Sequence, residues 1–329
     1  MRLDASQLSK IVHNALYHSF DGNGGLHIHR FTEEQRRIYG EENPDWVVRN
    51  IATASVTLDF ITDSDHLALC YEVSPGSGTG WGSIDMCVDG VFHDSRYIQD
   101  LGMTLAGFEL PAGEHRITVY LPWSMCMVIK EVHLSEGATV KPVEKKCKLL
   151  CFGDSITQGY SARFASLSYV NQVAAALDAE VINQGVGGYY FNAETLDESL
   201  LAYQPDIITV AYGTNDYSHK DTLEEYAERS GKFIAKLAAM YPDTKIVGIL
   251  PIYRNDANHR VRKMFRTYTL DEARQVLREQ YEACPNGYVL DETGIPHIPE
   301  AYFPDLLHPN DLGFTVMAQG VIRKLREIM

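Results

Sequence analysis

The pattern of apolar and polar positions divides the chain near residue 145. Before this point, apolar and polar side chains alternate in short segments rich in β-branched and aromatic residues, which is typical of half-buried β-strands. These segments lie at residues 47–60, 67–73, 84–88, 115–121 and 127–134. Asp89-Gly90, directly after the segment 84–88, is typical of a hairpin turn. Residues 1–145 are therefore predicted to form an all-β sandwich of jelly-roll-like topology.

After a polar, charged segment at residues 136–146, apolar runs alternate with segments of helical spacing. Strands are predicted near 148–152, 180–183, 206–212, 245–250 and 287–290, and helices near 166–178, 193–202, 221–241, 269–283 and 311–328. Repeated strand–helix units predict an α/β domain, a parallel sheet with helices on both faces. We therefore predict two domains, at 1–145 and 146–329.

One turn of the second half delivers a serine hydroxyl to the end of a buried strand. The apolar run 148–152 stops at Gly153-Asp154-Ser155, and helical spacing follows. Open α/β sheets bind their ligands at the carboxyl ends of their strands, and a helix amino terminus stabilises developing negative charge. Taken alone, the turn leaves two interpretations open, because Ser155 is equally well explained as a helix cap.

Three later blocks complete a pattern. Residues 183–188 (Asn-Gln-Gly-Val-Gly-Gly), 213–216 (Gly-Thr-Asn-Asp) and 305–308 (Asp-Leu-Leu-His) follow the Gly-Asp-Ser turn in order. In these four blocks the chain resembles the SGNH (GDSL-type) hydrolases, from Cys147 to Met329. The resemblance implies a flavodoxin-like three-layer domain with a five-stranded parallel sheet. It also implies a serine ester hydrolase with no metal and no organic cofactor.

The resemblance assigns roles to five residues. Ser155 is the nucleophile, His308 is the general base, and Asp305 orients and stabilises the imidazole. The backbone N–H groups of Ser155 and Gly188 and the side-chain amide of Asn215 are the donors of the oxyanion hole. Glycine at position 188 lets the backbone approach the substrate closely.

Several further residues are candidates near these blocks. A second Asp-x-x-His, from Asp256 to His259, follows a predicted strand at the same edge of the sheet, which makes His259 a rival base. No proline or closing helix follows it, so a solvated polar loop is the favoured interpretation. The candidate substrate-binding residues are Tyr160, Tyr189, Tyr190, Tyr217, Tyr253 and Arg254, with Trp81 and Trp123 as candidates from the sandwich.

Two other motifs have simpler explanations. The glycine-rich segment 75–82 lacks the Gly-Lys-Ser/Thr ending of a phosphate-binding loop, so a strand connection is predicted. His27 and His29 lie on one strand face, but no acidic or cysteine partner stands at ligand spacing, and no metal site is predicted.

The charge balance limits the partners. Lys and Arg total 29 against 44 Asp and Glu, a net charge of -15, which argues against nucleic acid or an anionic membrane as partner. The start of the chain lacks the apolar core of a signal peptide, so a cytoplasmic location is expected. Six cysteines without a Cys-x-x-Cys pair are predicted to be free thiols. A homo-oligomer is left open.

The order of the two predicted domains suggests a substrate. A β-sandwich before an SGNH domain is similar to the acetyl esterases of carbohydrate esterase family 2. Removal of O-acetyl groups from oligosaccharides or glycosides is therefore the predicted reaction. A short-chain acyl esterase or lysophospholipase is the alternative within hydrolases, although no basic amphipathic helix suits a lipid interface. An inactive carbohydrate-binding protein is the alternative of another class.

Overall fold

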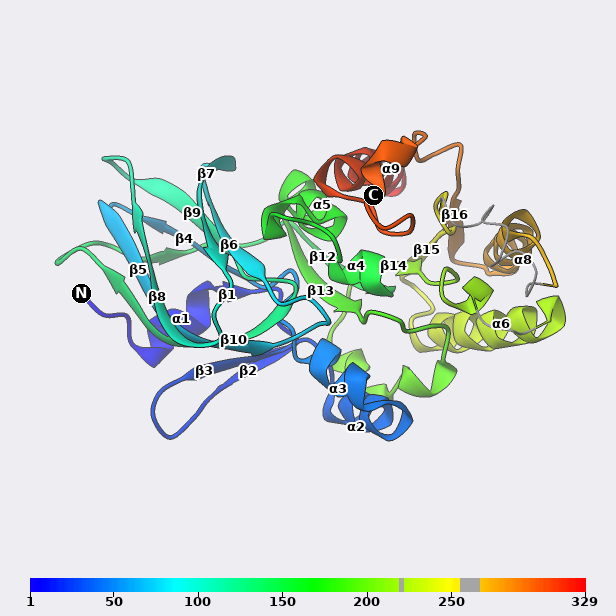
Figure 1. Cartoon of the computed structure of the whole chain (residues 1–329), viewed down its shortest axis with the longest axis horizontal. Helices are drawn as coiled ribbons and strands as arrows, with labels where there is room; N and C mark the ends of the chain where they lie inside the picture. The colour runs from blue at the N-terminus through cyan, green and yellow to red at the C-terminus, as the bar shows by residue number, and fades with distance from the viewer. Residues whose placement is uncertain (219–221, 255–266) are drawn as a thin grey trace.

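The computed structural model describes residues 1–218, 222–254 and 267–329. Two antiparallel sheets face each other in the first half of the chain, and a parallel sheet with helices forms the second half (Figure 1). The predicted all-β sandwich followed by an α/β domain is therefore confirmed. Within the described ranges, no helix combines the length and apolarity needed to cross a membrane.

The sandwich consists of two sheets around one apolar core. The first sheet has the order β1 (Val12–His13), β4 (Thr57–Thr62), β9 (His115–Tyr120), β6 (Gly82–Val88) and β7 (Val91–Ile98), with β11 (Lys141–Pro142) paired to β4. The second has the order β2 (Tyr17–Phe20), β3 (Leu26–His29), β10 (Met125–Leu134), β5 (His66–Pro75) and β8 (Gly102–Glu109). Alternate apolar residues of both sheets, such as Leu58, Phe60, Leu67 and Leu69, fill the core together with the helix α1 (Ala5–Ile11).

One predicted strand was wrong in its first half. Residues 44–50 form the helix α3 (Pro44–Asn50), and the strand β4 begins only at Thr57. The Asn43 side chain caps this helix by accepting a hydrogen bond from the N–H of Asp45. Pro44 occupies the first turn, where its missing N–H has no helical partner to lose. The local capping signal therefore prevails over the β-branched Val47-Val48 pair.

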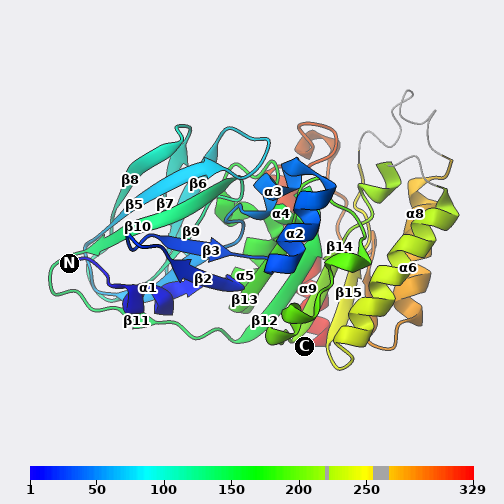
Figure 2. The same cartoon turned by 90° about the horizontal axis from the view of Figure 1, so that it is seen from below.

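The helix α3 and its neighbour α2 (Glu33–Glu42) leave the sandwich and lie against the α/β domain (Figures 1 and 2). Phe31 and Tyr39 belong to the same buried cluster as Leu150 of the parallel sheet. A segment before residue 145 thus contributes to the core of the second half, and the domain boundary at residue 145 stays a prediction.

The parallel sheet has the flavodoxin-like strand order that the family resemblance implies. The order is β13 (Ala179–Gly185), β12 (Cys147–Gly153), β14 (Ile207–Ala211), β15 (Lys245–Ile249) and β16 (Gly287–Leu290), and each neighbouring pair is parallel. The helices α5 (Tyr169–Leu177) and α9 (Asp311–Ile328) pack on one face, and α6 (Leu223–Met240) and α8 (Leu270–Ala283) on the other. Residues 193–202, predicted as a helix, form two short 3-10 turns instead.

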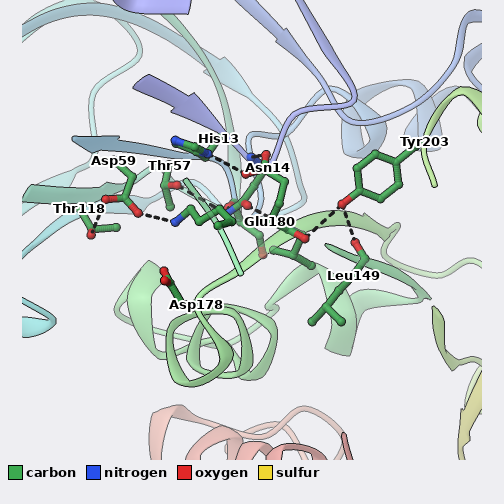
Figure 3. A network of polar contacts seen from close by, with 12 residues as sticks. His13, Asn14, Thr57, Asp59, Thr118, Leu149, Asp178, Glu180 and Tyr203 are labelled. Atoms are coloured by element: carbon green, nitrogen blue, oxygen red, sulfur yellow. Dashed lines mark hydrogen bonds and ion pairs between the residues drawn. The ribbon is translucent and has the colours of Figure 1, made fainter. Parts of the chain in front are cut away.

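Ion pairs and hydrogen bonds join the sandwich to the α/β domain (Figure 3). Glu180 at the start of β13 is bonded to Nδ1 of His13 on β1, with 2.6 Å between the atoms. Asp59 is fully buried and accepts two hydrogen bonds from Arg116, at 2.8 and 2.7 Å. Arg116 also contacts Asp178 of the second half at 2.8 Å. Charged groups of both halves are therefore partly or fully buried against each other at this interface.

Candidate active site

The turn after β12 presents Ser155 at the carboxyl edge of the parallel sheet. β12 is almost entirely buried, and the short helix α4 (Ser155–Gln158) begins with the serine itself. The side chain of Asp154 caps this helix by accepting a hydrogen bond from the N–H of Ile156 at 2.9 Å. Ser155 is 8% exposed, so its hydroxyl is largely shielded but reaches the surface of a pocket.

The structure brings Ser155, His308 and Asp305 together. Ser155 Oγ lies 2.7 Å from His308 Nε2, and His308 Nδ1 lies 2.6 Å from Asp305 Oδ2. The other carboxylate oxygen of Asp305 accepts the backbone N–H groups of His308 and Leu307, at 2.7 and 3.0 Å. This chain of contacts links a hydroxyl, a base and an orienting carboxylate, which is the geometry for nucleophilic attack by the serine.

The hydrogen bonds around Asp305 determine its charge. Partial burial disfavours the carboxylate, but the hydrogen bonds from the ring and the backbone N–H of His308 outweigh it and lower the pKa of Asp305 to about 2. Asp305 is therefore ionised at neutral pH. A carboxylate at this place favours the imidazole tautomer with its proton on Nδ1, which leaves Nε2 free to accept the proton of Ser155.

The backbone N–H groups of the 185–189 turn differ in whether they donate a hydrogen bond within the protein. Gly185 donates to the side chain of Asn183, and Gly187 donates to Oε1 of Gln158, both at 2.8 Å. Within the described residues, the N–H groups of Gly188 and of Ser155 have no acceptor. Gly188 has a φ of +83°, which favours glycine. These two N–H groups are therefore available to a ligand oxygen, and their place in an oxyanion hole stays a prediction.

Asn215, the third predicted donor of the oxyanion hole, also lies at the pocket of Ser155. The side-chain amide of Asn215 donates one hydrogen bond to the carbonyl of Tyr189 at 2.8 Å, which fixes its orientation. The amide carries a second N–H, and Asn215 lines the same pocket as Ser155 and Gly188.

The pocket around Ser155 has a volume of about 230 Å³ and is open to solvent. The second half of the chain contributes most of its walls, and the first half contributes three residues. Its lining residues are Arg49, Ser77, Gly78, Ser155, Gln158, Tyr160, Gly187, Gly188, Asn215, Leu307 and His308. The loop between β5 and β6 therefore forms part of the site, and so does the helix α3.

The predicted substrate-binding residues have different positions. Tyr160 lines the pocket, and its ring centroid lies 4.4 Å from that of His308. Tyr189 and Tyr217 are buried below the surface. Tyr253 lines a different pocket. Arg254 is 1% exposed and donates to the carbonyl of Thr214 at 2.8 Å. The rival base His259 lies outside the described residues.

The two tryptophans of the sandwich form a row of rings behind Tyr160. The centroid of Trp123 lies 5.3 Å from that of Tyr160, and Trp81 meets Trp123 edge to face at 5.9 Å. Trp123 is 1% exposed and donates its Nε1–H to the carbonyl of Ala162 at 2.8 Å. The row supports the ring of Tyr160 from the side of the sandwich, so Trp123 packs behind the pocket.

Sequence reasoning missed Arg49, Gln158, Ser77 and Gly78 as residues of the site. Arg49 lies in the predicted strand 47–60, whereas the Asn43-Pro44 capping signal indicates a helix there. Ser77 and Gly78 belong to the glycine-rich connection, whose proximity to the serine depends on how the two domains pack. Gln158 stands in the block of the nucleophile, but its partners Gly76 and Trp123 are remote in sequence.

The family of the chain follows from its sequence. Residues 151–316, about half of the chain, match the GDSL-like Lipase/Acylhydrolase family. The chain belongs to this family, and its class is therefore that of the GDSL-type ester hydrolases. The matched residues include Ser155, Asp305 and His308, but neither α3 nor the loops of the sandwich. No curated protein sequence matches the chain.

Solved structures share the fold over both halves. The salicylyl-acyltransferase SsfX3 from a tetracycline biosynthetic pathway aligns with a TM-score of 0.83 and 21% identity, over 100% of this chain and 97% of that chain. A family two carbohydrate esterase from Cellvibrio japonicus aligns with a TM-score of 0.67 and 21% identity, over 100% and 97%. A family two carbohydrate esterase from Clostridium thermocellum, in complex with cellohexaose, aligns with a TM-score of 0.65 and 15% identity, over 84% and 93%.

Proposed function

We propose that this chain is a serine ester hydrolase that removes O-acetyl groups from oligosaccharides or glycosides through an acyl-enzyme. The observation that carries the proposal is the continuous contact from Ser155 Oγ to His308 Nε2, at 2.7 Å, and from His308 Nδ1 to Asp305, at 2.6 Å. This contact lies in a solvent-open pocket next to backbone N–H groups that have no acceptor within the described residues.

In the proposed mechanism, Ser155 Oγ attacks the ester carbonyl carbon while His308 Nε2 takes its proton. The carbonyl oxygen becomes negatively charged and accepts hydrogen bonds from Gly188, Asn215 and the N–H of Ser155. Asp305 stabilises the imidazolium. When the tetrahedral intermediate collapses, the bond to the alcohol breaks, and His308 gives its proton to the leaving oxygen. Water, deprotonated by His308, then attacks the acyl-enzyme. Collapse breaks the bond to Ser155 Oγ and releases acetate, while His308 returns the proton to Ser155 Oγ.

Three features support a carbohydrate substrate. The pocket has an aromatic face in Tyr160, a hydroxyl group in Ser77 and an amide group in Asn215, a mixture that suits a sugar ring. The sandwich contributes to the rim, so a substrate larger than the acyl group contacts both halves. Two structures of the same two-part fold are family two carbohydrate esterases. The proposed partner is a small-molecule or oligosaccharide ester.

A second candidate is acyl transfer, because the structure with a TM-score of 0.83 is a salicylyl-acyltransferase. The same acyl-enzyme gives transfer when an acceptor alcohol attacks it in place of water. The pocket is open to solvent, which favours hydrolysis, since a transferase must keep water from the acyl-enzyme. Adding a sugar acceptor to the assay and measuring transferred against released acetate separates the two.

The test is acetate release from acetylated xylo-, gluco- and manno-oligosaccharides, compared with p-nitrophenyl acetate, butyrate and octanoate. We expect one sugar series to be hydrolysed, and activity to disappear in Ser155→Ala and His308→Ala. Asp305→Asn should lower kcat by about two to four powers of ten, whereas Asp100→Asn, an exposed control, should not change it.

Preference for octanoate with no sugar hydrolysis would replace the proposal by a short-chain acyl esterase or lysophospholipase. Activity that survives in His308→Ala but not in His259→Ala would overturn the assignment of the base.

A further inference from the structure

Arg49 is the one charged residue that the first half of the chain brings to the pocket of Ser155. It lies on α3, outside the residues that match the family. Its side chain is 26% exposed, and the nearest carboxylate oxygen among the described residues, on Asp45, is 3.5 Å away on a side chain that is 72% exposed. An exposed carboxylate at this distance screens the charge weakly. Arg49 therefore keeps a positive charge at the wall of the pocket.

The guanidinium of Arg49 donates from Nη1 to the carbonyl oxygen of Gly187. This carbonyl belongs to the same peptide group as the N–H of Gly188. Because a peptide group is planar and trans, fixing its C=O fixes the direction of its N–H on the opposite side. Arg49 thus determines where the N–H of Gly188 points.

This peptide group needs such a constraint. It lies between two glycines, and Gly188 has a φ of +83°, so little steric resistance prevents the group from turning over. Gln158 holds the preceding N–H, that of Gly187, at 2.8 Å, but does not contact the carbonyl. Arg49 also packs closely here, since a Cβ at position 188 would lie 2.8 Å from its Nη1.

The same contact changes the strength of the donor. A hydrogen bond from a cation to a peptide carbonyl withdraws electrons through the peptide group and strengthens its N–H as a donor. The carbonyl oxygen of the substrate ester, which accepts this N–H, becomes negatively charged only as Ser155 attacks. Both effects of Arg49 therefore act on the transition state more than on the bound substrate, which predicts a change in kcat with little change in KM.

We propose that Arg49 is a positioning residue for ester hydrolysis, which holds and polarises the Gly187–Gly188 peptide group so that its N–H donates to the oxyanion. The α2–α3 segment, which comes before the residues that match the family, then completes the oxyanion hole. The inference rests on the proposed function only through Ser155 as nucleophile and Gly188 as donor. It does not depend on the sugar.

The experiment compares Arg49→Met, Arg49→Lys and the control Arg37→Met in p-nitrophenyl acetate hydrolysis. Arg37 is an exposed residue of α2 that pairs with Glu34 and Glu41. We expect Arg49→Met to lower kcat about ten- to hundredfold with KM within about a factor of two, because the donor is misdirected rather than removed. Arg49→Lys should recover part of the loss, and Arg37→Met should behave as the unchanged protein.

A transition-state analogue gives a second readout that loss of folding would not imitate. Methylboronic acid forms a tetrahedral adduct with the serine, and its affinity should fall in Arg49→Met by the same factor as kcat/KM. Full kcat in Arg49→Met, or a raised KM with unchanged kcat, would overturn the inference. Hydrolysis that persists in Ser155→Ala would instead refute the proposed function, so the two failures are distinguishable.

Discussion

Asp154 carries a buried carboxyl group beside the nucleophile. It is 0% exposed, and only Oδ1 has a hydrogen bond, from the N–H of Ile156; Oδ2 has no partner within the described residues. Burial disfavours the charged form and raises the pKa of Asp154 from 3.8 to about 6, with the nearby Asp216 adding to the shift and His308 opposing it. The turn that presents the serine is therefore held by a carboxyl group that is costly to ionise.

This carboxyl group makes the stability depend on pH. Its pKa is higher in the folded chain than in the unfolded chain. Its contribution to the free energy of unfolding is therefore fully present below pH 3.8 and is lost as the pH rises through about 6. Asp154→Asn cannot ionise. We therefore expect the stability of this variant, relative to the unchanged protein, to increase by up to about 3 kcal/mol from about pH 4 to about pH 8. Urea unfolding of both proteins across this pH range measures the difference in their free energies of unfolding. A difference that is independent of pH would contradict the prediction.

Among the elements, α4 connects the two halves of the chain through Gln158. Its Nε2 donates to the carbonyls of Gly76 and Trp123, both at 3.2 Å, and its Oε1 accepts the N–H of Gly187 at 2.8 Å. Two loops of the sandwich and the oxyanion turn therefore meet at one side chain. The oxyanion turn is therefore held by Gln158, the last residue of the helix that begins with Ser155.

Replacing Gln158 by Met should affect both stability and rate. The change keeps the length of the side chain but leaves three buried backbone groups without their partner, which should lower the free energy of unfolding by about 2–4 kcal/mol. The released Gly187 turn should lower kcat about tenfold. Gln172→Met is the matched control: Gln172 donates to one carbonyl, that of Leu167, at the base of α5. Equal kcat in the two variants would show that Gln158 has no part in ordering the site.

The same elements show what the sequence can and cannot predict. The strands of the parallel sheet, the three blocks at their ends and the fourth block before α9 were predictable, because apolar runs and turn residues are local signals. The helix α3 has a weaker local signal, since Val47-Val48 favours a strand and only the Asn43-Pro44 cap favours a helix. Arg49 and Gln158 could not be assigned, because their partners lie in loops that only tertiary packing brings near. The burial of Arg254 is equally a property of the fold.

At the scale of the whole molecule, the two halves share one core as well as one active site. Phe31 and Tyr39 pack among the apolar residues of the parallel sheet. Arg30 is 1% exposed and donates to the carbonyls of Asn183 and Gly185, in the strand that leads to the oxyanion turn. Neither a sandwich without the sheet nor a sheet without residues 30–50 keeps these groups buried and paired.

The whole chain should therefore unfold in one cooperative transition. All three tryptophans lie before residue 145, and Trp46 and Trp123 contact Tyr189 and Tyr160 of the second half. Their fluorescence therefore reports the packing of the two halves, whereas far-UV circular dichroism is dominated by the helices, and the three longest described helices follow residue 145. We expect the two probes to have coincident midpoints in urea. A fragment of residues 146–329 should aggregate or remain inactive, because it lacks Arg30, Tyr39 and Arg49. Separate midpoints, or an active fragment, would mean that the packing of residues 30–50 against the sheet contributes little to stability.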